Sequence, residues 1–117
     1  MKRFMVLALL LATPQCAFAH AMLLKSEPAV GDNVSPPPTE LVLHFSEGVE
    51  PAFTTVIVTD GSGGQVQSGA PAVATGDQKI LHVPLKPLAA GEYKVEWHAT
   101  SVDTHKTNGH FGFSVKP

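Results

Sequence analysis

The feature that most constrains this chain is a strict alternation of apolar and polar side chains near its end. In residues 92–98 the side chains of Tyr93, Val95 and Trp97 fall on one face, and charged or polar side chains fall on the other. The same period of two recurs in 40–46 and 111–115. Nothing after residue 20 has the period of an amphipathic helix. The pattern therefore restricts the chain to an all-β fold.

The spacing of the strands and turns indicates which all-β fold to expect. Further strands are predicted at 21–25, 54–59 and 79–83, with a weak edge strand at 65–68 and a loop over 69–78. Asn108-Gly109 is a favoured hairpin turn, and the Leu and Gly just ahead of Tyr93 are typical of a tyrosine corner. We predict an immunoglobulin-like Greek-key β-sandwich or barrel of about seven strands.

The first nineteen residues have the three parts of a secretory signal peptide. Lys2 and Arg3 precede an apolar run over 4–12, and Ala17-Phe18-Ala19 fits a signal peptidase site. That run has nine residues, well short of the about twenty that a membrane-spanning helix needs, which disfavours the alternative of a membrane anchor. We expect residues 1–19 to be cleaved and residues 20–117 to form one domain in the periplasm.

Removing the leader changes which chemistry the chain can perform. Cys16, the only cysteine, lies within it, so the processed chain has neither a disulfide nor a thiolate ligand. Loss of Lys2 and Arg3 also changes the net charge from −2 to −4 with histidine neutral. An acidic domain is unsuited to nucleic acid or to an anionic membrane surface, but it suits a protein that handles a cation.

Three residues could together hold a metal ion. Cleavage after Ala19 makes His20 the first residue, and its α-amine and ring Nδ1 can then chelate one metal. Asp103 and His105 lie two apart in Ser101–His105, the expected end of a strand, and so share a face. Three nitrogens and one oxygen suit tetragonal copper(II). The alternative is that Asp103 and His105 only form a polar pair at a strand end.

Four segments carry a resemblance to a known family: His-Ala-Met-Leu-Leu-Lys-Ser-Glu-Pro-Ala at 20–29, Leu-His-Phe-Ser-Glu at 43–47, residues 88–97, and Ser-Val-Asp-Thr-His at 101–105. In this order they resemble CopC-type periplasmic copper-binding proteins over the whole processed chain. The resemblance implies a Greek-key β-sandwich that carries copper, with a CopD-like inner-membrane transporter as partner. It also implies one copper(II) ion held by His20, Asp103 and His105.

Other residues near this site have less definite roles. Glu47 matches an acid that family members have near the copper, where it could orient the N-terminal amine or His20 by hydrogen bonding; a solvated carboxylate is the alternative. His110 could approach the site or simply flank the Asn108-Gly109 turn. The remaining histidines, His44, His82 and His98, are expected on outward-facing, solvated strand positions.

The sequence favours a monomeric copper(II) carrier or buffer for copper resistance that has no enzymatic activity. After the leader the only methionine is Met22, so a thioether copper(I) site is not expected. One alternative is a copper monooxygenase, which also uses an N-terminal histidine chelate. The anionic ligand Asp103 disfavours it, because the carboxylate would fill a position that oxygen uses. The other alternative is a metal-free immunoglobulin-like interaction module.

Overall fold

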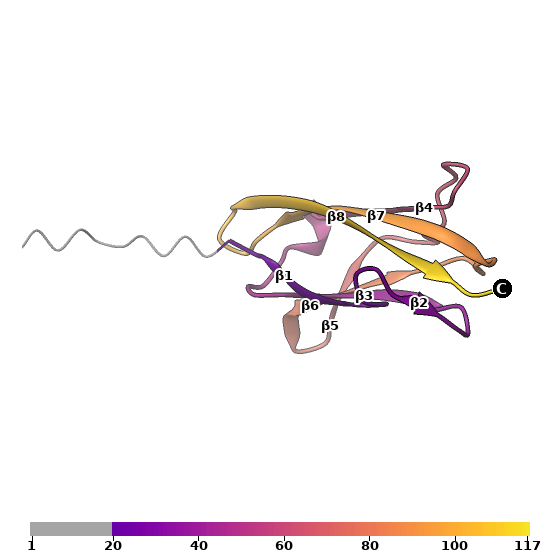
Figure 1. The fold of residues 1–117 in the computed structure, drawn as a ribbon. Coiled ribbons are helices and arrows are strands. Elements are labelled where there is room, and N and C mark those ends of the chain that lie inside the picture. Colours follow the sequence, from indigo (N-terminus) through magenta and orange to yellow (C-terminus); the bar gives the residue numbers. More distant parts are fainter. Residues whose placement is uncertain (1–19) are drawn as a thin grey trace, which may run out of the picture.

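The computed structural model describes residues 20–117, which form two four-stranded β-sheets packed face to face (Figure 1). The predicted signal peptide, residues 1–19, lies outside the described residues. The elements in chain order are β1 (Leu23–Glu27), β2 (Asn33–Val34), β3 (Glu40–Phe45), the single 3₁₀ turn η1 (Pro51–Phe53), β4 (Thr55–Thr59), β5 (Ala72–Ala74), β6 (Asp77–Pro84), β7 (Gly91–Thr100) and β8 (Lys106–Val115). Within residues 20–117 there is no helix long and apolar enough to cross a membrane.

The strand order confirms the predicted β-sandwich. One sheet runs β1-β3-β6-β5 and the other β2-β8-β7-β4. All pairs are antiparallel except β2 with β8, which is parallel. The longest pairing is the β7–β8 hairpin, which runs in register from Gly91↔Val115 to Thr100↔Lys106. Residues 20–117 form eight strands rather than about seven. Two of them, β2 and β5, are only two and three residues long, too short to show a pattern in the sequence.

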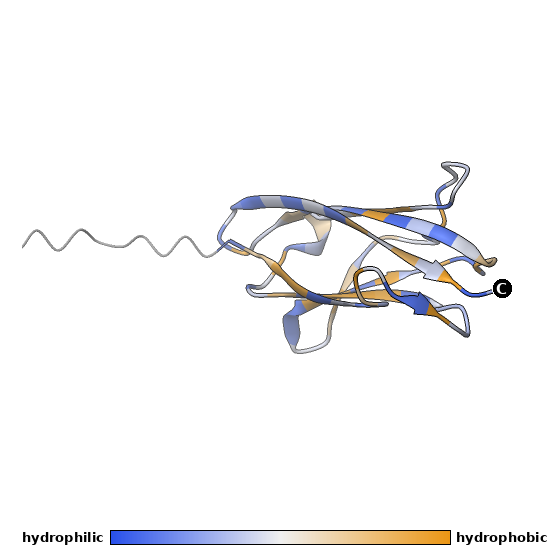
Figure 2. Cartoon of the chain, viewed as in Figure 1, coloured by the Kyte–Doolittle hydropathy of each residue, from blue (hydrophilic) through white to orange (hydrophobic). Residues whose placement is uncertain are grey.

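The alternation in β7 sets the inner face of its sheet, and Figure 2 shows it as changing colours along the strand. Tyr93, Val95 and Trp97 are buried, whereas the residues between them are exposed. Trp97 meets Phe45 of the other sheet edge to face, with ring centroids 5.4 Å apart. Tyr93 donates its hydroxyl hydrogen to the carbonyl of Ala89 at 2.6 Å, which confirms the tyrosine corner. Aromatic contacts thus join the two sheets.

The predicted position of the last hairpin turn is wrong. Asn108 and Gly109 lie inside β8, opposite His98 and Trp97. The turn is instead formed by Ser101–His105, which was predicted to be the end of a strand, and Thr104 there has a φ of 73°. Glycine is needed at 109 for a different reason: a Cβ there would lie 2.6 Å from the Trp97 ring. Gly109 is therefore required for packing against Trp97, although Asn-Gly is typical of a turn.

The segment between β4 and β6 also differs from its prediction. Residues 65–68 make only isolated bridges, Thr59↔Gln65 and Gln67↔Leu85, rather than a strand. Residues 69–78, predicted to be loop, include β5 and the start of β6. β5 has only three residues, and its register against β6 shifts within them. It is therefore too short to show the alternation of apolar and polar residues from which strands were predicted.

Candidate metal centre

The residues just before β1 lie across one end of the sandwich and contact both sheets. Ser46, which follows β3, donates its hydroxyl hydrogen to the carbonyl of His20 at 3.0 Å and accepts the N–H of Met22 at 2.9 Å. Thr107 of β8 donates to the carbonyl of Ala21 at 2.8 Å. The Ala21 side chain is fully buried. These contacts hold the backbone of 20–22 in place and bring His20 beside the β7–β8 turn.

The β7–β8 turn is organised by the buried hydroxyl of Ser101. That hydroxyl donates to Oδ1 of Asp103 and accepts the backbone N–H of His105 at 3.1 Å. The N–H of Val102 donates to the carbonyl of Gly48 at 2.9 Å, and Ser101 bridges to Val49. The turn is thus hydrogen-bonded to the residues that follow Ser46. The segment after β3 therefore contacts both the N-terminal residues and the β7–β8 turn.

At this end of the sandwich His105 lies beside His20 on one hand and Asp103 on the other. The rings of His20 and His105 have centroids 5.3 Å apart and are tilted by 51°. His105 Nδ1 lies 3.2 Å from Oδ2 of Asp103, and these two side chains are 41% and 42% exposed. With a metal–nitrogen distance of about 2 Å, two imidazoles on one ion have centroids at most about 6 Å apart. The ring spacing therefore fits a shared ion.

Both carboxylate oxygens of Asp103 already have partners. Ser101 binds Oδ1 and His105 binds Oδ2. The hydrogen bond from Ser101, with a smaller contribution from His105, lowers the pKa of Asp103 below its usual value of 3.8, so the group is an anion at neutral pH. A carboxylate on Nδ1 favours the histidine tautomer whose Nε2 can bind a metal. In this arrangement Asp103 orients His105, and it must release or share Oδ2 to become a ligand itself.

The metal-binding set is only partly assembled. Within residues 20–117, no group of three or more His, Asp or Glu side chains is gathered so that it could hold a metal ion. A fourth expected donor is not a side chain at all. In the full chain the nitrogen of His20 is a peptide nitrogen, and it becomes an amine only if the chain is cleaved before it.

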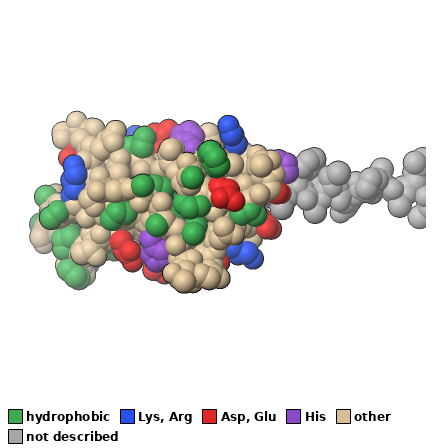
Figure 3. Space-filling model, turned by 180° about the vertical axis from the view of Figure 1, so that it is seen from behind, with side chains coloured by type: hydrophobic (Ala, Val, Ile, Leu, Met, Phe, Trp, Pro, Cys, Tyr) green, Lys and Arg blue, Asp and Glu red, His purple; other side chains and the backbone are tan. Residues whose placement is uncertain are grey.

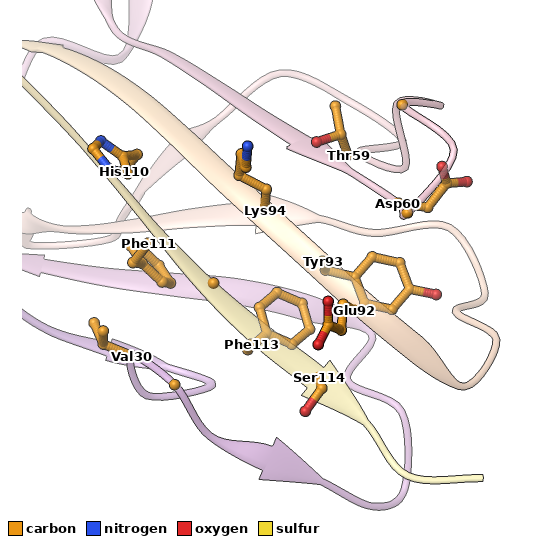
Figure 4. A pocket seen from close by; sticks show the side chains of 14 residues that line it. Val30, Thr59, Asp60, Glu92, Tyr93, Lys94, His110, Phe111, Phe113 and Ser114 are labelled. Carbon is orange, nitrogen blue, oxygen red and sulfur yellow. The ribbon is translucent and has the colours of Figure 1, made fainter.

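Glu47 and His110 lie in different places. Glu47 is half-buried between Ser46 and Gly48, whose contacts hold the N-terminal residues and the β7–β8 turn. His110 is on β8, five residues beyond His105 and about 17 Å along the strand. There it lines a groove of about 710 Å³ together with Lys94 (Figure 4). The backbone at Glu47 thus lies close to the site, whereas His110 lies well away from it.

The remaining histidines pair with carboxylates on the sheet surfaces. His82 lies 3.3 Å from Glu40, and His98 lies 3.4 Å from Glu96. His44 was expected to be solvated but is only 21% exposed, with its Nε2 3.5 Å from Glu27. Figure 3 shows the histidines of one face well apart from one another, each with an acidic side chain nearby.

The sequence prediction did not include Ser46, Ser101 or Thr107. The hydrogen bonds of Ser46 and Thr107 to the N-terminal residues join positions 24 to 86 apart in the chain, whereas those of the Ser101 hydroxyl stay within its own turn. Ser46 and Ser101 do fall inside the segments 43–47 and 101–105 that carry the family resemblance. Thr107 has no such signal, because a threonine in a strand is ordinary.

Comparison with known proteins shows the family to which the chain belongs. The CopC domain family matches residues 23–116. Protein YobA of Escherichia coli K12 is 41% identical over 112 residues, which cover 95% of this chain and 90% of that protein. Copper resistance protein C of Pseudomonas syringae pv. tomato is 38% identical over 106 residues, covering 86% and 83%. The crystal structure of CopC from Methylosinus trichosporium OB3b superposes with a TM-score of 0.78 at 30% identity, covering 84% of this chain and 95% of that one.

Proposed function

Because the chain belongs to the CopC family of copper-binding resistance proteins, which are not enzymes, we propose that it binds one copper(II) ion in the periplasm and buffers or carries it. The ion is its cargo. The observation that carries this proposal is the approach of His20 to His105, residues 85 positions apart whose rings lie 5.3 Å from each other. Two imidazoles and a carboxylate at one end of the sandwich form a donor set suited to copper.

The proposed ligands are the α-amine and ring of His20, the ring of His105 and the carboxylate of Asp103. Asp103 and His105 already touch, so a small rotation of the carboxylate would expose Oδ2 to an ion. Glu47 is proposed to orient the new N-terminal amine by hydrogen bonding, as its place beside Ser46 allows. These groups are nitrogen and oxygen donors, and the only methionine after residue 19 is Met22. That composition favours copper(II) over copper(I).

The proposal includes the route by which the protein reaches copper. Residues 1–19 act as a signal peptide, and residues 20–117 are the exported domain, which works as a monomer. The family resemblance supports a CopD-like inner-membrane transporter as the partner that receives or supplies the ion. The net charge of −4 after cleavage supports a role in handling a cation.

The test compares the chain that starts at His20 with the same chain carrying one extra Met before His20. The added residue converts the amine into an amide nitrogen, which is not basic at neutral pH, and destroys the chelate. Copper(II) affinity, measured by competition with a chelator of known strength, should fall by several orders of magnitude. The EPR spectrum of the His20-first form should show a tetragonal copper with two imidazole nitrogens.

A matched control places the extra residue after Pro117, at the other end of the sandwich, where it should leave affinity unchanged. Mass spectrometry of exported protein should show His20 as the first residue. Equal copper affinity in the Met-extended and His20-first forms would refute the proposed site, and equal competition by zinc would refute the preference for copper.

A further inference from the structure

Residues 20–22, which we call the N-terminal strap, are held by side-chain hydroxyls from both sheets. On one side, Ser46 both donates to the carbonyl of His20 and accepts the N–H of Met22. The backbone N–H of Ser46 also donates to the carbonyl of Met22 at 2.8 Å. These contacts attach the strap to the end of β3 before the β1–β3 pairing begins.

The other attachment comes from β8, the strand that begins directly after His105. Thr107 lies two residues beyond His105, and its hydroxyl donates to the carbonyl of Ala21 at 2.8 Å. Ala21 is fully buried, so the middle of the strap is also fixed by packing. Each contact point lies within two residues of an imidazole: Ala21 directly follows His20, and Thr107 is separated from His105 only by Lys106. The two hydroxyls therefore restrict the backbone close to both imidazole rings.

We propose that Ser46 and Thr107 are positioning residues for copper binding. Their hydroxyls order the strap in advance, so that His20 faces His105 before the ion arrives. This inference rests on the proposed function. A chain end with no such attachment would be free to move, and the free energy of copper binding would be reduced by the entropy lost on ordering it. Fixing it beforehand leaves more of the binding free energy for affinity.

The hydroxyls act on the backbone and not on the ion, which separates this role from that of a ligand. Ser46 and Thr107 are both half-buried and each bonds a carbonyl of the strap. Removing either hydroxyl leaves every proposed donor atom in the chain. The expected signature is thus weaker copper binding with an unchanged set of ligands.

The test uses His20-first protein with Ser46→Ala, Thr107→Val and the double variant. The control is Ser114→Ala, which removes a β8 hydroxyl that bonds Asn33 at 3.1 Å, far from the strap. Thr107→Val should raise the copper(II) Kd by about tenfold, the effect of one net hydrogen bond, and Ser46→Ala, which loses two, by at least as much. The control should not change the Kd. Thr107→Ser, which keeps the hydroxyl, should restore the affinity. The EPR spectra should still show two imidazoles.

A second measurement uses metal-free protein and does not depend on copper. The Met22 amide, whose hydrogen goes to Ser46, should exchange faster with solvent in Ser46→Ala than in the wild type or in Ser114→Ala. Unchanged exchange and unchanged affinity would overturn the inference. Loss of the β-sheet circular dichroism signal in both Ser46→Ala and Thr107→Val would also overturn it, because the hydroxyls would then be structural. Failure of the wild type to bind copper through two imidazoles would instead refute the proposed function.

Discussion

Asp60 follows β4 and closes the tight turn 60–64 with its own side chain. Its Oδ1 accepts the N–H and the hydroxyl of Ser62 at 3.0 and 2.8 Å, and the N–H of Gly64 at 2.8 Å. The Ser62 hydroxyl contributes most, and together these donors lower the pKa of Asp60 below its usual 3.8. The turn thus depends on the negative charge of the Asp60 carboxylate.

We predict that Asp60→Asn destabilises the fold near neutral pH and that this effect disappears in acid. The folded pKa is below the unfolded one, so the carboxylate stabilises the protein above the unfolded pKa, and that stabilisation is lost as the pH falls through the folded pKa. Urea unfolding of both proteins across the acidic range would measure it. A destabilisation that is the same at every pH would show that the charge is not the cause.

Two substitutions at the proposed copper site should have unequal effects. His105→Ala removes a nitrogen donor and should abolish one of the two imidazole couplings, whereas Asp103→Asn keeps the shape and should only weaken copper binding. Both side chains are about two-fifths exposed, so the β-sheet circular dichroism should persist in both variants. Copper binding that survives His105→Ala with two imidazoles would exclude His105 as a ligand.

At the scale of elements, the β7–β8 hairpin depends on a glycine that lies under an aromatic ring. A Cβ at position 109 would come within 2.6–2.9 Å of three atoms of the Trp97 indole, which is itself packed against Phe45. Gly109→Ala should therefore lower the free energy of unfolding by about 1–3 kcal/mol, the usual cost of overpacking. Gly61→Ala is the control, because nothing lies within 4 Å of its Cβ. Thermal or urea unfolding, with Trp97 fluorescence, would measure both.

The same hairpin shows how far the sequence alone could lead. The alternation in 92–98 and 111–115 correctly predicted the two strands and the buried face, because a period of two depends only on local pattern. The turn between them was misplaced, because Gly109 serves a contact with Trp97 twelve residues away and not a local bend. Pattern reasoning has no access to such contacts.

The prediction of the candidate site had the same limit: local sequence features were visible, and long-range contacts were not. His20, Asp103 and His105 were predicted as ligands from residue type and family resemblance, and Asp103 and His105 meet in a turn rather than on one face of a strand. The hydroxyls of Ser46 and Thr107 went unnoticed, because serine and threonine are common and their role depends on partners far away in the chain. Long-range backbone contacts became visible only in the folded molecule.

At the scale of the whole molecule, the proposed site joins the first described residues to the last hairpin. An ion bound there contacts only the folded arrangement, so it should stabilise the fold by mass action. With free copper(II) at about a hundred times Kd, the free energy of unfolding should rise by about 2.7 kcal/mol. Thermal melts of His20-first protein with copper and after removal by a chelator would measure it. A Met-extended chain should show no such gain, and an equal gain there would contradict the site.

The two ends of the described chain lie at opposite ends of the sandwich (Figure 1). β8 runs away from the turn that carries His105, so Pro117 ends up remote from His20. A solid support, fluorophore or electrode coupled through Pro117 would hold the domain with its histidine end turned outward to the solution. The same coupling through the amino terminus would consume the very nitrogen that copper is proposed to bind. For an immobilised copper sensor, the choice of tether therefore determines whether the device responds.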